Sequence, residues 1–276
     1  MTNRGVIYCA TTRDQYLEAA LMSAMALRQL DPTLPITLIS DRPLLQQFPV
    51  SDYGITPRFI EPNELDDQGA FLSRSIKTQL SRFSPYQETL FLDADILPIR
   101  PVSTLWPYLD HGDFAMVLDR NPTVGQCDHV AQEEIDYTLH RVPGNTPHFN
   151  SGVIVWRKTP GTQQLFQDWH QEWQHFKKQD QLALVRALNT TPIAIVPLPG
   201  TYNTSPRDAA PLLRQNIEVH LLHCWGGVVM AGEYPSFAKM YYPDVVSAVE
   251  EHLEFDRLRG CLKSFEESQF MPIASP

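Results

Sequence analysis

Short apolar runs that alternate with helical patterns constrain the fold of this chain more than any other feature. The runs Val6–Cys9, Ile36–Ile39 and Thr89–Leu92 are largely apolar and continuous, which is typical of strands buried on both faces of a parallel sheet. Between such runs lie segments with apolar residues at helical spacing. The sequence therefore predicts an α/β fold, a mostly parallel Rossmann-like sheet flanked by helices.

The remaining elements follow from the same patterns. Further strands are expected at 58–60, Phe114–Leu118, Gly152–Trp156, Ile193–Val196 and Ile217–Leu222. One helix is expected to begin at a capping box at Thr12–Gln15 and to end at Asp31-Pro32. Its apolar residues Leu17, Leu21, Ala24 and Leu27 recur at helical spacing. Others are expected over Ser73–Phe83, over 162–178 with a Trp169/Trp173 core stripe, and from Asp244 with Val245, Ala248, His252 and Phe255 on one face.

Composition narrows the function. The chain has 276 residues and a formal net charge of −10, and without a basic run it does not look like a nucleic-acid binder. An acidic protein that binds an anionic diphosphate needs local positive charge, which a metal ion supplies compactly. No run reaches the ~18 apolar residues of a membrane span. The N-terminus lacks a signal-peptide pattern, so a cytoplasmic location is expected.

The four cysteines, Cys9, Cys127, Cys224 and Cys261, show no Cys-x-x-Cys spacing. Scattered cysteines of this kind indicate reduced, mostly buried thiols, and we expect no structural zinc site.

An acidic pair follows the strand Thr89–Leu92. Asp93 and Asp95 stand at the carboxyl end of that strand, the edge at which α/β sheets bind ligands. Residues two apart in a strand share a face, so both carboxylates are expected to point into one site. Such oxygen ligands suit Mg²⁺ or Mn²⁺. The alternative is a surface turn after a strand.

The region Thr89–Pro98 resembles the Asp-x-Asp region of GT-A fold glycosyltransferases, in particular the family 8-like group that includes glycogenin and bacterial lipopolysaccharide galactosyltransferases. The resemblance extends, in the order of the family, over most of the chain from residue 6 to about 226. It continues in Tyr8–Thr12, in Phe149-Asn150-Ser151-Gly152-Val153, in Asp180-Gln181 and in His223-Cys224-Trp225-Gly226.

This resemblance implies a single GT-A domain over 1–276. Residues 1–120 would bind the nucleotide sugar and metal, 121–230 the acceptor, and 231–276 would be helical. It implies that Asp93, Asp95 and His223 hold Mn²⁺ or Mg²⁺. It also implies a nucleotide-sugar donor, such as a UDP-sugar, with retention at the transferred carbon. The acceptor, whether sugar, lipid or protein, stays open. The other implied donor-site and catalytic residues are Ala10, Thr11, Thr12, Ala94, Gly226, Asn150, Asp180, Gln181, and Arg74 or Lys77.

One feature departs from the family. No Lys-Pro-Trp follows Gly226, and the next lysine is Lys239, so another basic residue, such as Arg207, is needed for the diphosphate. Several of these residues also have a purely structural alternative. The alternatives are a core histidine for His223, a turn cap for Asn150, a solvated helix end for Asp180, and a solvated helix face for Arg74 and Lys77.

Alternatives to a transferase are a nucleotide-sugar binding module without turnover, a nucleotidyltransferase and a glycosidase. A nucleotidyltransferase is expected to carry a glycine-rich basic loop after its first strand, and Cys9–Asp14 contains no glycine. A glycosidase depends on the separation of two carboxylates, which a sequence does not give.

Overall fold

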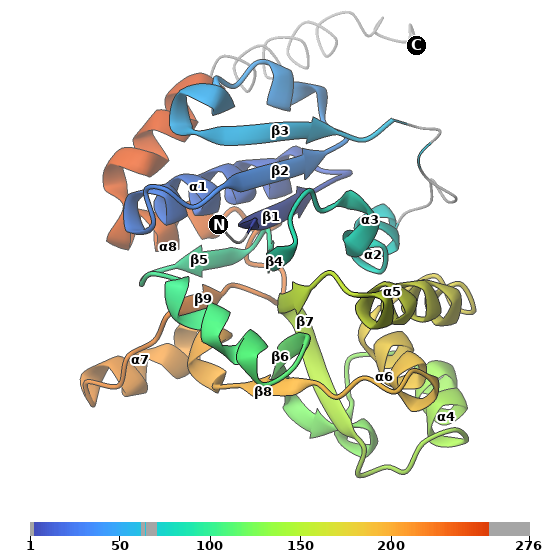
Figure 1. Ribbon diagram of the computed structural model, residues 1–276. Coiled ribbons are helices and arrows are strands. Elements are labelled where there is room, and N and C mark those ends of the chain that lie inside the picture. Colours follow the sequence, from blue (N-terminus) through green and yellow to red (C-terminus); the bar gives the residue numbers. More distant parts are fainter. Residues whose placement is uncertain (1–2, 62–63, 65–70, 254–276) are drawn as a thin grey trace, which may run out of the picture.

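A seven-stranded sheet organises the molecule (Figure 1). The computed structural model describes residues 3–61, 64 and 71–253. Four of the six strand pairs are parallel, and β7 runs antiparallel to both of its neighbours. The predicted mostly parallel α/β sheet is therefore confirmed. In sheet order the strands are β3 (Ile55–Phe59), β2 (Ile36–Ser40), β1 (Arg4–Ala10), β4 (Glu88–Asp93), β7 (Pro147–Arg157), β6 (Phe114–Thr123) and β8 (Val196–Leu198).

Helices cover both faces of this sheet, as Figure 1 shows. They are α1 (Asp14–Leu30), α2 (Leu72–Lys77), α3 (Leu80–Phe83), α4 (Gln132–Leu139), α5 (Pro160–Trp173), α6 (Gln181–Thr190), α7 (Pro206–Arg214) and α8 (Tyr234–Tyr241).

Alternate residues of β1 enter different cores. Val6 and Tyr8 pack with α1 and α8, whereas Ile7 and Cys9 pack with α2, α3, α5 and α6. This alternation follows from the period of two along a strand.

No described helix is both long and apolar enough to cross a membrane. Short 3₁₀ segments complete the regular structure of the described residues. The 3₁₀ segments are η1 (Pro43–Gln46), η2 (Val50–Tyr53), η4 (Ser103–Asp110), η5 (Val124–Gln126) and η6 (Gly200–Tyr202).

A second, two-stranded sheet was not predicted. It pairs β5 (Ile96–Pro98) with β9 (Leu221–His223). The prediction of a strand over Ile217–Leu222 was wrong at its start, because Ile217 is solvent-exposed and the ladder begins only at Leu221. Likewise Ile193–Val196 forms no ladder before Val196. A three-residue strand is too short to show a pattern of its own.

The predicted helices differ from the observed ones at their ends. The capping box at Thr12–Gln15 was wrong, because Arg13 is the N-cap of α1 and no side chain caps it. The helix over Ser73–Phe83 is broken into α2 and α3, and at the break Thr78 Oγ1 donates to the Ser75 carbonyl, a bond that competes with helix continuation. The helix expected to reach residue 178 ends at Trp173.

The C-terminal helix is present over residues 243–253, and its predicted inward face was right at Val245 and Ala248 but wrong at His252. The buried positions are Val245, Val246, Val249 and Leu253, whereas His252 is exposed. Phe255 lies outside the described residues. The predicted core role of Trp169 and Trp173 is confirmed, since both are almost fully buried.

Candidate active site

A cavity of about 520 Å³ opens where β1 and β4 end. This is the carboxyl edge of the parallel strands, where α/β sheets place their ligands. Of the residues predicted for the site, only Ala10 is missing from its lining; Ala10 is buried and its carbonyl accepts a hydrogen bond from Ser40. The predicted residues that line the cavity are Thr11, Thr12, Arg74, Lys77, Asp93, Ala94, Asp95, Asn150, Asp180, Gln181, His223 and Gly226.

The acidic pair reaches the cavity by a different route from the one predicted. Asp93 is the last residue of β4, and Asp95 lies in a turn before β5. The shared-face argument for a regular strand was therefore wrong. The turn, and not the strand repeat, brings both carboxylates to the cavity.

His223 is brought to the acidic pair by the small sheet. It is the last residue of β9 and pairs with Ile96 of β5, next to Asp95. The Cys224 amide donates to the Asp95 carbonyl at 2.9 Å, and His223 Nε2 lies 3.2 Å from Asp95 Oδ1. One ligand atom from each of Asp93, Asp95 and His223 lies within 4.8 Å of the others.

The hydrogen bonds around His223 fix which ring nitrogen faces the carboxylates. Asn203 donates its Nδ2 hydrogen to Asn150 Oδ1 at 2.9 Å, so its Oδ1 is an acceptor. That oxygen lies 2.7 Å from His223 Nδ1, which must therefore carry the hydrogen. Nε2 is thereby turned toward Asp95, the arrangement in which a histidine can bind a metal through that nitrogen. Two carboxylates and one imidazole nitrogen suit Mn²⁺ or Mg²⁺.

Lys77 is the buried cation of the site. Its Nζ lies 2.8 Å from the Asp93 carboxylate and 3.4 Å from Ser151 Oγ. Burial lowers the pKa of Lys77, but the charges of Asp93 and Asp180 outweigh burial and the net pKa is raised. The ammonium therefore stays charged and neutralises one carboxylate of the pair.

The two carboxylates differ in their proton affinity. Burial raises the pKa of Asp93 above its usual range, and Lys77 offsets this only in part. Burial also acts to raise the pKa of Asp95, but the contact with His223 outweighs it and the pKa is lowered. Burial raises the pKa of Cys9, which also lines the cavity, to about 12. This thiol stays protonated near neutral pH and offers no nucleophile.

A buried carboxylate, Asp119, organises the amides on the other side of the cavity. It accepts hydrogen bonds from Asn150 Nδ2 at 3.1 Å and from Gln181 Nε2 at 3.0 Å. Burial acts to raise the pKa of Asp119, but the bonds from the Asn121 amide, Asn150 and Gln181 outweigh it and the pKa is lowered. A charged Asp119 therefore holds both amides in place.

Asp180 precedes α6 and is buried at the cavity wall. Trp169 Nε1 donates to its carbonyl at 2.7 Å, which ties this point of the chain to α5. Among the described residues its Oδ2 has no hydrogen-bond partner. Its carboxylate does not cap α6, so the prediction that it is a solvated helix end does not hold.

The turn after β1 and the glycines after β9 form two further walls. Thr12 has φ +69°, and its amide donates to Asp41 at 3.0 Å. Gly226 and Gly227 have φ +78° and +92°, a region that favours glycine. A Cβ on either would meet nothing within 4 Å, so the main chain there is open to a ligand.

Residues 88–224 match the family model described as nucleotide-diphospho-sugar transferase. The matched range contains Asp93, Asp95, Asn150, Gln181 and His223. The chain is a GT-A fold glycosyltransferase. Its reaction is sugar transfer from a nucleotide-sugar donor.

Solved structures share the fold of this enzyme at low sequence identity. The galactosyltransferase LgtC, solved with donor and acceptor sugar analogues, is 13% identical with a TM-score of 0.58, covering 86% of this chain and 96% of its own. GlyE from Streptococcus pneumoniae is 15% identical with a TM-score of 0.55 and coverages of 99% and 66%. Mouse xyloside xylosyltransferase 1 is 12% identical with a TM-score of 0.51 and coverages of 80% and 97%. No curated protein sequence matches the chain.

Several residues of the enzyme's site were not assigned a role from the sequence. Arg13 and Tyr16 line the cavity, and Asn203 and Asp119 form the hydrogen bonds described above. Asp119 follows the predicted strand Phe114–Leu118, so its place at a strand end was a usable signal, whereas Arg13 and Tyr16 gave none. Arg207, considered as a substitute for the missing lysine, does not line the cavity.

Proposed function

We propose that the enzyme holds Mn²⁺ or Mg²⁺ between Asp93, Asp95 and His223 and uses it to bind a UDP-sugar. The sugar then passes to an acceptor with retention of configuration. The convergence of these three ligand atoms within 4.8 Å, on side chains that line the cavity, carries the proposal. Nε2 of His223 offers its lone pair there because Asn203 holds the opposite nitrogen.

The charges that line the cavity support the need for a cation. Its three basic residues, Arg13, Arg74 and Lys77, are matched by three acidic ones, Asp93, Asp95 and Asp180. Without a metal the lining has no excess positive charge to attract a diphosphate. When bound, the divalent cation supplies Lewis-acid stabilisation of the charge that develops on the leaving diphosphate.

In the proposed reaction the bond between the sugar carbon and the terminal phosphate oxygen breaks, and its electron pair leaves with the nucleoside diphosphate. The acceptor oxygen forms the new bond on the same face, and its proton passes to the departing phosphate. Lys77, held at Asp93, and Arg13 and Arg74 at the walls attract the phosphates. The open backbone at Gly226 and Gly227 allows close approach of the diphosphate.

Two amides are proposed to face the sugar. Gln181 is fixed by bonds to Asp119 and to the Phe149 carbonyl, and Asn150 by bonds to Asp119 and the Gly152 amide. Fixed dipoles of this kind stabilise a cationic sugar carbon without moving. Asp180, with its unpartnered Oδ2, is positioned for sugar hydroxyls. In an inverting enzyme it would be the candidate base.

Residues 121–230 supply Asn150, Asp180 and Gln181, and we assign acceptor binding to this half. The acceptor class, whether sugar, lipid or protein, stays open. The three cysteines among the described residues are free and buried, which supports the proposed cytoplasmic location.

A panel of nucleotide sugars tests the proposal. The metal-stripped enzyme is incubated with UDP-, GDP- and ADP-sugars, with and without Mn²⁺, and release of nucleoside diphosphate is followed. We expect release from a UDP-sugar that depends on the metal, and NMR of the first-formed product should show retained anomeric configuration. Binding without release supports the module without turnover. Pyrophosphate-dependent formation of a nucleoside triphosphate supports the nucleotidyltransferase. Either outcome overturns the proposal.

A further inference from the structure

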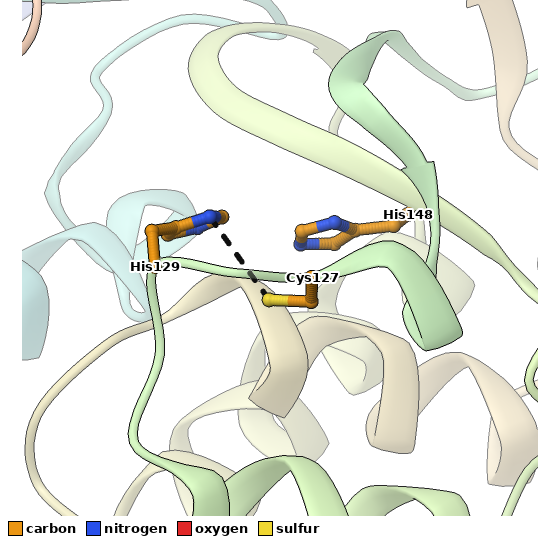
Figure 2. A group of neighbouring side chains, drawn as sticks. All are labelled: Cys127, His129 and His148. Carbon is orange, nitrogen blue, oxygen red and sulfur yellow. Dashed lines mark hydrogen bonds between the residues drawn. The ribbon is translucent and has the colours of Figure 1, made fainter.

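A second group of metal-ligating side chains lies outside the cavity. Cys127, His129 and His148 place one ligand atom each within 4.8 Å of one another, and none of the three lines the cavity. Figure 2 shows the two imidazoles side by side with the Cys127 sulfur beneath them. The ring centroids are 5.7 Å apart, and the ring planes differ by 16°.

His148 is prepared as a ligand by its surroundings. It is the second residue of β7 and fully buried, with 0% exposure. Its Nδ1 lies 3.1 Å from the Asn121 carbonyl, so Nδ1 carries the hydrogen. Nε2 is thus the nitrogen with a free lone pair, and among the described residues it has no hydrogen-bond partner. A buried acceptor without a partner is costly unless something fills its place.

His129 is prepared in the same way from the other side. Gln181 donates its Nε2 hydrogens to Asp119 and the Phe149 carbonyl, so its Oε1 is an acceptor. That oxygen lies 2.8 Å from His129 Nε2, which must therefore be the protonated nitrogen. Nδ1 is therefore the nitrogen that faces Cys127 Sγ, at 4.0 Å, and that would bind a metal. A carbonyl oxygen thus fixes the tautomer of each histidine, as at metal sites.

We propose that Cys127, His129 and His148 form a Zn²⁺ site. One thiolate and two imidazoles are ligands that zinc prefers, whereas Mg²⁺ and Mn²⁺ prefer oxygen. In a tetrahedral zinc site the sulfur and nitrogen ligands lie about 3.5 Å apart. A small side-chain movement would bring Cys127 Sγ and His129 Nδ1, now 4.0 Å apart, to that distance. The fourth position falls to water or to Asp128, whose Oδ1 lies 3.6 Å from His129 Nδ1 and also accepts from Arg120 and Asn121.

The ion would join parts of the enzyme that are distant in sequence. Cys127 and His129 lie in the loop after η5, and His148 lies at the start of β7, immediately before Phe149 and Asn150. His129 also holds Gln181 directly. Zinc would therefore act as a positioning element for the amide that faces the donor sugar. The proposal departs from the expectation of no zinc site, which rested on the lack of Cys-x-x-Cys pairs. That expectation did not take account of His148, which comes from a strand distant in sequence from the loop that holds Cys127 and His129.

Cobalt substitution tests the proposal on the full-length chain. The chelator-stripped, reduced protein is titrated with Co²⁺, and absorption is recorded. We expect a thiolate-to-cobalt charge-transfer band with tetrahedral visible bands, both displaced by Zn²⁺. Cys127→Ser should abolish the charge-transfer band. His129→Gln, a change at a partly exposed side chain, should weaken Zn²⁺ binding by at least about tenfold while the far-ultraviolet CD spectrum stays native.

Two matched variants separate this site from others. His140→Gln removes an exposed histidine from the end of α4, and Asp95→Asn damages the site in the cavity; both should keep the band. The proposal is overturned if the wild type shows no thiolate band, if the band survives Cys127→Ser, or if it disappears with Asp95→Asn. A zinc affinity that His129→Gln leaves unchanged would also contradict it.

Discussion

Gly152 faces His223 so closely that a side chain at position 152 would displace the imidazole. A Cβ there would overlap His223 Cε1 and would stand 2.9 Å from Nδ1. The glycine in Asn150-Ser151-Gly152 is thus required by the ring behind it. The same three-residue segment supplies Asn150 Oδ1, which accepts from both Gly152 and Asn203.

Gly152→Ala is therefore expected to weaken Mn²⁺ binding at least about tenfold, because the imidazole must move out of line with Asp95. Isothermal titration calorimetry with Mn²⁺ measures this. Gly200→Ala is the matched control, since a Cβ there meets nothing within 4 Å. Unchanged Mn²⁺ affinity in Gly152→Ala would show that His223 is not a ligand.

Asn203 contacts His223 Nδ1 and so turns Nε2 toward Asp95 and the proposed metal position. Asn203→Leu should therefore lower Mn²⁺ affinity by roughly 10- to 100-fold. The change removes the acceptor of the Nδ1 hydrogen. Asn203→Asp restores an acceptor at the same place and is expected to recover most of the affinity. If the aspartate variant is as weak as the leucine variant, Asn203 has a general packing role and does not orient the histidine.

Asp119→Asn should destabilise the fold in a pH-dependent manner. The pKa of Asp119 is lowered in the folded protein, so its stabilisation is present above the unfolded pKa of about 4 and is lost as pH falls through the folded value. We expect the variant to lose about 1–3 kcal/mol of unfolding free energy at neutral pH. The loss should shrink below about pH 4. Urea unfolding at several pH values measures this, and a loss independent of pH would contradict it.

Lys77 Nζ lies 2.8 Å from the Asp93 carboxylate, so the ammonium would compete with the proposed metal for this ligand. Lys77→Met should therefore raise Mn²⁺ affinity in the absence of donor by up to about tenfold and weaken binding of the nucleotide sugar. Lys239→Met, at an exposed position outside the cavity, is the control. Weaker Mn²⁺ binding in Lys77→Met would show that the ammonium supports the metal site.

The sequence was most informative where the chain is locally regular. The apolar runs at Val6–Cys9 and Thr89–Leu92 are true strands because both of their faces are covered. Asp93 was placed correctly because the end of a strand is visible in such a pattern. The resemblance, and not the spacing, brought in His223, since its position depends on the unpredicted pairing of β5 with β9.

The rest depended on tertiary contacts. Arg13 has no local signature, and the contact of Asn203 with His223 joins residues that are 20 positions apart in the sequence. The break between α2 and α3 arises from a side-chain bond of Thr78 that helical periodicity does not reveal. His148 lies before the predicted strand Gly152–Trp156 and carries no signal of its own, and only the fold places it beside Cys127 and His129.

Metal-dependent nucleotide binding tests the central claim most directly. UDP is titrated by calorimetry into the wild type and Asp95→Asn, each stripped with chelator and then supplied or not supplied with Mn²⁺. Asp95 contacts His223 at 3.2 Å and shares the site with Asp93. We expect Mn²⁺ to tighten UDP binding to the wild type at least about 100-fold and to have little effect on Asp95→Asn. UDP binding that is equally tight without metal, or a full Mn²⁺ effect in Asp95→Asn, would contradict the account.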